Sequence, residues 1–81
     1  MRIHPHARGR MRERGATEEE VESTIGKGER YAAKFGRQGF RQDFQFDTEW
    51  QGRRYATKQV EVIAVFEQGD WLAISVIVKY F

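Results

Sequence analysis

Apolar side chains near the start of the chain recur with the period of an α-helix. Ile3, Ala7 and Met11 follow one another at intervals of four residues, which places them along one side of a helix. We therefore predict a helix over residues 5–14, because the only proline of the chain opens this range and proline is favoured at the first helical position. Gly15 is well placed to end the helix in a left-handed conformation.

A capping signal predicts a second helix directly afterwards. Thr17 and Glu20 have the spacing of a capping box, in which the side chain of each accepts a hydrogen bond from the backbone N–H of the other. Residues 18–20 are three consecutive glutamates in the first turn, where the helix dipole favours negative charge. They therefore indicate a helix start rather than an acidic active site, and we expect the helix to end at Gly26.

After residue 28 the period of the pattern falls to two, which is typical of β-strands. Aromatic and polar residues alternate between residues 40 and 46 and predict a strand with an aromatic face. Residues 31–35 are expected to form a weak strand or a turn, and residues 47–52 a turn. Two long β-rich segments, residues 53–66 and 71–81, predict two further strands.

The loop between the last two strands sets their predicted register. We expect a three-residue loop over residues 67–69, with Gly69 in the left-handed conformation. Apolar residues would then face one another in the pairs Val60/Val76, Val62/Ile74 and Ala64/Leu72. The helices would pack on the strand face that carries Leu72, Ile74, Val76 and Val78. The opposite face is half polar and half aromatic, and we expect it to be only partly covered.

These elements predict a single α+β domain over residues 1–81, with two N-terminal helices packed on an antiparallel sheet of three or four strands. A chain of 81 residues supports one hydrophobic core. It has no cysteine, which excludes disulfides, thiolate metal sites and a cysteine nucleophile. Its longest apolar run, residues 71–78, is too short to span a bilayer, and no signal peptide precedes it. We expect a cytoplasmic protein without membrane contact.

Charge is segregated along the chain although the net formal charge is only +2. Residues 1–14 sum to +4, residues 15–29 to −4, residues 30–58 to +4 and the remaining residues to −2. Such blocks give an uneven surface field. Two interpretations stay open: a functional basic face, or a basic and an acidic helix that attract each other side by side.

Basic side chains suggest two candidate phosphate sites. Arg8 and Arg12 are one turn apart on the first helix, and guanidinium groups match phosphate oxygens in pairs. A second group gathers at one end of the predicted sheet: Arg53, Arg54, Lys58, Lys79 and Tyr80. Cations neutralise phosphates and aromatic rings stack on bases, so this end is a candidate RNA surface. The alternatives are salt bridges to the acidic helix for the first group and protection of a sheet edge for the second.

Histidine occurs twice, at His4 and His6, on either side of a proline. No cysteine or nearby carboxylate completes a metal site, so we expect no metal and no cofactor. Histidine can nevertheless transfer protons near neutral pH, which makes His6 a candidate catalytic group. The aromatic residues of the middle segment are expected to serve as core or dimer contacts; they are Phe40, Phe44, Phe46 and Trp50. No glycine-rich phosphate loop or Ser/His/Asp series is present.

Both ends of the chain resemble the domain of unknown function 4258 family of small bacterial proteins. The similar segments are residues 6–21 (HARGRMRERGATEEEV), 58–65 (KQVEVIAV) and 71–81 (WLAISVIVKYF). Ala16 stands where a larger aliphatic residue is usual, and Ser75 where threonine is usual. The resemblance implies a fold related to RelE-type toxins, which cleave RNA without a metal and are paired with an antitoxin.

Two functional hypotheses follow. In the first, the protein is a RelE-like toxin that binds RNA or the ribosome and acts as a metal-independent endoribonuclease. Phosphate would be bound by Arg8, Arg12, Arg53, Arg54 and Lys58, and the catalytic groups would be Tyr80, His6 and Lys79. In the second, the protein is a non-catalytic interaction module that forms a homodimer or binds a small antitoxin-like protein.

Overall fold

The computed structural model describes the whole chain, residues 1–81, and contains the two predicted helices. Helix α1 spans Pro5–Arg14, as predicted, and Gly15 follows with a φ of 79°. Helix α2 spans Glu18–Lys27 and begins with the predicted capping box. It runs past the predicted end at Gly26 to Lys27, and the C-cap Gly28 donates a 2.8 Å hydrogen bond from its backbone N–H to the carbonyl of Thr24. The helix therefore continues through Gly26.

Five strands form one mixed sheet in the order β1-β5-β4-β3-β2. Their bounds are β1 Arg2–Ile3, β2 Glu29–Ala32, β3 Gln38–Trp50, β4 Arg53–Glu67 and β5 Asp70–Tyr80. The α+β class is confirmed, but the prediction of three or four antiparallel strands was too simple. Strand β1 pairs in parallel with β5, and β2 pairs with β3. Two to four residues carry almost no periodicity, so these short edge strands give a weak sequence signal.

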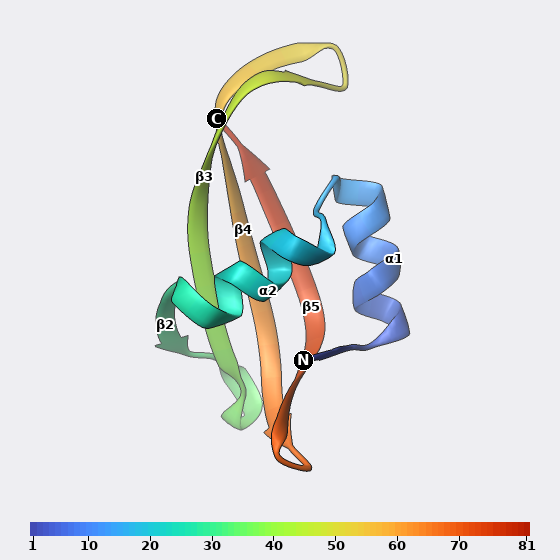
Figure 1. Cartoon of the computed structure of the whole chain (residues 1–81), viewed down its shortest axis with the longest axis vertical. Helices are drawn as coiled ribbons and strands as arrows, with labels where there is room; N and C mark the ends of the chain where they lie inside the picture. The colour runs from blue at the N-terminus through green and yellow to red at the C-terminus, as the bar shows by residue number, and fades with distance from the viewer.

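Both helices cover the same face of the sheet (Figure 1). Helix α1 packs along β5, and α2 packs across β4 and β3. The core between them consists of ten buried residues: Ala7, Met11, Ala16, Val21, Phe40, Val60, Val62, Ala64, Ala73 and Val76. The opposite face carries no α-helix; only the short 3-10 turn η1, Lys34–Gly36 in the β2–β3 loop, lies on that side. Neither helix has the length and apolar character needed to cross a membrane.

The predicted register between β4 and β5 is wrong, for two reasons. The turn has two residues, Gln68 and Gly69, with φ angles of 54° and 73°, the signs of a type I′ hairpin turn. Further along, Ile63 pairs with Ser75 and Ala64 pairs with Ala73, which leaves Ile74 unpaired in a bulge.

This bulge changes which residues of β5 face the helices. Val62 pairs with Val76 instead of Ile74. Ala73 is buried in the core and Trp71 packs against it, whereas Leu72 and Ile74 are absent from the core cluster that was predicted to contain them.

Strands β3 and β4 extend beyond the sheet as a two-stranded ribbon over residues 46–57. The predicted turn at residues 47–52 is shorter in the structure, because β3 continues to Trp50 and only Gln51 and Gly52 turn, both with positive φ. Asp47, with a φ of 49°, lies in a bulge between Gln45 and Thr48. Figure 1 shows this ribbon curling over the helix side, toward the connection between α1 and α2.

Candidate nucleic-acid interface

The face of the sheet opposite α1 and α2 carries two adjoining grooves beside the β2–β3 loop. Side chains alternate across a strand, so the residues of β4 between the buried valines, Glu61 and Ile63, point to this face. The β2–β3 loop, residues 33–37, is closed by a 2.9 Å hydrogen bond from the Ala33 N–H to the Arg37 carbonyl. It lies over Ile63 and Ser75, and the grooves open beside it.

The first groove has a volume of about 480 Å³ and combines aromatic, apolar and basic side chains. Its lining is Tyr31, Ala32, Ala33, Lys34, Phe35, Arg37, Ile63 and Ser75. Phe35 is 86% exposed and has a φ of 60°, a conformation that bulky residues rarely adopt. Because such backbone conformations are concentrated at functional sites, an exposed strained aromatic residue beside a groove is a candidate ligand contact.

The second groove, of about 410 Å³, is lined by His4, His6, Arg37, Ile74 and Ser75. It adjoins the first, because Arg37 and Ser75 line both. The bulge in β5 contributes to this groove, since the unpaired Ile74 and its neighbour Ser75 both lie in its wall. No acidic side chain lines either groove, although the chain has 12 acidic residues.

The Lys and Arg side chains at these grooves have no carboxylate partner, and Arg37 is in addition exposed beside an aromatic ring. Lys34 and Arg37 make no ion pair, and the guanidinium carbon of Arg37 lies 5.6 Å from the ring centre of Phe35. In contrast, acidic side chains pair with Arg2, Arg8, Arg10, Arg41 and Lys58. Arg37 is therefore available to an anionic ligand at the junction of the two grooves.

Tyr31 is held firmly at the first groove. Its ring covers Gly39, its partner on β3, so closely that a Cβ atom at Gly39 would overlap it. Its hydroxyl donates a hydrogen bond to the carboxylate of Glu61. Burial, this hydrogen bond and the charge of Glu61 raise the pKa of Tyr31 to about 12, while the nearby Arg41 lowers it. The ring thus has a fixed position at the groove.

We expect the Tyr31 contact to make stability fall at alkaline pH. Tyrosine in the unfolded chain ionises near pH 10, whereas folded Tyr31 ionises at about 12. The contribution is complete below pH 10 and is lost as the pH rises from about 10 to 12. Urea midpoints at pH 9 and 11 should therefore differ more for the wild type than for Tyr31→Phe, which lacks the ionisable group. Equal losses in the two proteins would contradict the contact.

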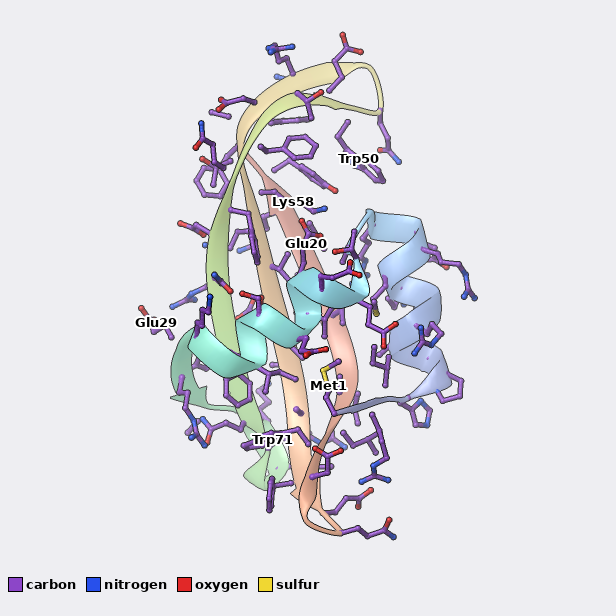
Figure 2. The ribbon with its side chains drawn as sticks, in the orientation of Figure 1. Met1, Glu20, Glu29, Trp50, Lys58 and Trp71 are labelled. Atoms are coloured by element: carbon purple, nitrogen blue, oxygen red, sulfur yellow. The ribbon has the colours of Figure 1, made fainter.

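Lys58, predicted to bind phosphate, is instead part of the helix-covered side. It is 5% exposed, its Nζ lies 2.8 Å from the carboxylate of Glu20, and it also donates to the carbonyl of Gly15. Figure 2 shows Lys58 and Glu20 pointing toward each other beneath the ribbon that carries Trp50. A nearby carboxylate on α2 already neutralises this lysine, which argues against the phosphate role that the sequence predicts for it.

Tyr80, a predicted catalytic residue, belongs to the same cluster. Its ring stacks on Trp50 with centroids 5.1 Å apart, and its hydroxyl donates a 2.7 Å hydrogen bond to the carbonyl of Arg14. Phe46 and Tyr55 also contact the ring. Burial, with the charge of Glu20, raises the pKa of Tyr80. A raised pKa opposes ionisation, so Tyr80 is poorly suited to accept a proton here.

The predicted catalytic set is not brought together. Lys79 is exposed and, as the neighbour of Tyr80 on β5, points to the opposite face of the sheet. His6 lies at the start of α1, whereas Tyr80 contacts Arg14 at its end, roughly 12 Å further along the helix at 1.5 Å per residue. The three residues therefore occupy three separate places.

The remaining predicted phosphate contacts also lie apart from the grooves. Arg8 is 3.6 Å from Glu18, which agrees with the alternative interpretation of a basic helix beside an acidic one. Arg12 is exposed on α1. Arg53 and Arg54 lie at the ribbon tip, where Arg54 donates a 2.8 Å hydrogen bond to the Asp47 carbonyl. Of the predicted site residues, only His6 lines a groove.

Sequence reasoning missed Lys34, Phe35 and Arg37, which lie in a weakly patterned segment. The composition of residues 33–37, AKFGR, could have indicated a binding loop, because two basic residues flank an aromatic residue and a glycine. No group of three or more His, Cys, Asp or Glu side chains is arranged to hold a metal ion.

Comparison with known proteins adds no assignment, since the chain matches no protein-family model, no curated protein and no solved structure.

Proposed function

We propose that the protein binds single-stranded RNA on the uncovered face of the sheet. The observation that carries this proposal is the position of Arg37, which lines both of the adjoining grooves. Basic and aromatic side chains line these grooves, and no carboxylate does. Arg37 and Lys34 would contact phosphates, and the exposed Phe35 would offer its ring surface to a base, with the Tyr31 ring, packed on Gly39 and beside Arg41, as a wall of the groove. Base stacking on aromatic side chains combined with cations along the backbone is the usual basis of single-strand binding.

A single strand fits this face better than a duplex. The bases of a duplex are stacked on one another, whereas those of a single strand can be splayed out onto protein rings. Both ring-bearing residues and both cations lie within the first groove, so backbone and base contacts are available over the length of one or two nucleotides.

We further propose that the protein is related to RelE-type toxins in binding RNA, that the ribosome is its target, and that it acts in the cytoplasm. The packing of two helices on one face of the sheet supports it. The proposal does not extend to cleavage by His6, Lys79 and Tyr80, because these residues lie in three separate places. The second hypothesis is a protein-binding module, and it rests on apolar side chains of the same face, such as Ile63 and Ile77. The experiment below distinguishes protein binding from RNA binding.

We expect Arg37→Ala to weaken RNA binding about 10- to 150-fold, because one hydrogen bond to a charged group contributes about 1.5–3 kcal/mol. Fluorescence anisotropy with a labelled 12-nucleotide single strand at low salt measures the affinity. The slope of log affinity against log salt should fall by about 0.7, the value for one phosphate contact on a single strand.

Lys27→Ala is the matched control, because it removes one exposed positive charge on the helix side. Equal weakening by the two substitutions would contradict a site at Arg37. Absence of RNA binding by the wild type, together with a stable dimer in light scattering, would replace the proposal with the protein-binding hypothesis.

A further inference from the structure

The second groove gathers hydrogen-bond donors from three separate parts of the fold. His4 and His6 come from the start of α1, Ser75 comes from β5, and Arg37 comes from the β2–β3 loop. We propose that this groove holds a terminal phosphate, so that the protein recognises the phosphorylated end of a strand. This inference rests on the proposed RNA binding and adds a basis for selectivity, the phosphate at the end of the RNA.

The orientation of His4 is fixed by its role in the helix. Its Nδ1 accepts a 3.1 Å hydrogen bond from the backbone N–H of His6 and thereby caps α1. The proton of the neutral ring must therefore lie on Nε2, which becomes a donor. His4 has a structural reason to keep this tautomer whether or not a ligand is present.

The donor set suits a terminal phosphate better than an internal one. A phosphomonoester carries a charge of about −1.5 to −2 near pH 7 and three strong acceptor oxygens. An internal phosphodiester has one negative charge and two free oxygens. Arg37 can supply paired N–H donors, and the two imidazoles and the Ser75 hydroxyl supply three more groups. No carboxylate in the lining repels a second negative charge.

The adjoining groove gives the attached nucleoside a place. Because Arg37 and Ser75 line both grooves, a phosphate beside them lies next to the ring surfaces of Phe35 and Tyr31. The shared chemistry is a nucleoside monophosphate. It can be supplied by the end of a strand or by a free nucleotide, and the experiment separates these sources.

The test compares one 12-nucleotide RNA in three forms: with a 5′-phosphate, with a 3′-phosphate, and with hydroxyl groups at both ends. We expect one of the phosphorylated forms to bind the wild type about tenfold more tightly than the hydroxyl form. In the double variant His4→Asn/His6→Ala this preference should disappear, so that the phosphorylated and hydroxyl forms bind with equal affinity. Asparagine is a good N-cap residue, so α1 keeps its cap. Circular dichroism checks the fold, and Lys27→Ala again serves as the charge control.

The outcomes separate the two proposals. Equal affinity for all three strands, with a loss of affinity in Arg37→Ala, overturns the recognition of strand ends and leaves RNA binding intact. Absence of binding by every strand overturns both. A preference that survives in the double variant places the phosphate elsewhere and contradicts this groove. Competition by adenosine monophosphate at the affinity of the strand identifies the free nucleotide as the ligand, and failure to compete identifies the strand end.

Discussion

Replacing Gly15 with alanine should destabilise the protein by about 2–5 kcal/mol, because two costs add. Gly15 has a φ of 79°, and a left-handed conformation costs a residue with a Cβ atom about 1–2 kcal/mol. The added Cβ would also lie 2.6 Å from the Trp50 ring and 2.7 Å from the Tyr80 hydroxyl, and overpacking of this kind costs about 1–3 kcal/mol. Urea unfolding followed by tryptophan fluorescence measures the change.

Gly9→Ala is the matched control in the same helix. Gly9 lies inside α1, has no positive φ, and a Cβ there would meet no atom within 4 Å. Alanine should therefore stabilise the protein by about 0.5–1 kcal/mol, the usual difference between glycine and alanine inside a helix. Similar effects of the two substitutions would mean that Gly15 is not constrained by the ribbon.

Replacing Lys58 with methionine should cost about 2–4 kcal/mol of stability. Removal of one member of a buried ion pair typically costs 3–5 kcal/mol, and we expect a smaller value here because the Glu20 side chain keeps 21% exposure. The substitution leaves the carboxylate of Glu20 and the carbonyl of Gly15 without their shared donor. Denaturant unfolding measures the loss.

A double variant isolates the ion pair. Glu20→Gln keeps the capping hydrogen bond from the Thr17 N–H but removes the charge. Lys58→Met should cost less in this background than in the wild type, and additive costs would argue against coupling between Lys58 and Glu20. RNA affinity of the folded protein should not change. A protein with unchanged stability and weakened RNA binding would instead support the phosphate role that the sequence predicted for Lys58.

The helices were predictable because their signals are local. Pro5, Gly15 and the capping box of Thr17 and Glu20 act within one or two turns, and all appear in the structure as predicted. The two long strands were predictable for the same reason, since alternation is read within each strand. The α+β class followed from the order of these elements.

Pairing between strands was not predictable to the same degree. The β4–β5 turn places Gln68 at a φ of 54°, although Asn or Asp would be the usual residue before glycine in such a turn. The unpaired Ile74 then shifts the register once more. The two-residue turn and the bulge would each alter which residues of β4 and β5 pair, and neither feature has a clear signal in the sequence.

The candidate interface was the least predictable part of the molecule. Basic side chains were visible in the sequence, but their carboxylate partners come from other elements, as Glu20 does for Lys58. Arg37 and His4 are 33 positions apart and come together only because the β2–β3 loop folds over β4 and β5. A pattern along the chain cannot record that placement.

The parallel pairing of β1 with β5 bears on the order in which the chain folds. Strands β3, β4 and β5 follow one another through two-residue turns and can assemble as successive hairpins, which form within about 1–10 μs in isolation. Strand β1 can join only when residues 72 and 73 are already in place, 70 positions away. The backbone N–H of His4 bonds to the Ala73 carbonyl, so the second groove is completed in this late step. An RNA end bound there would bind only the form in which β1 is paired with β5, and would therefore stabilise that pairing.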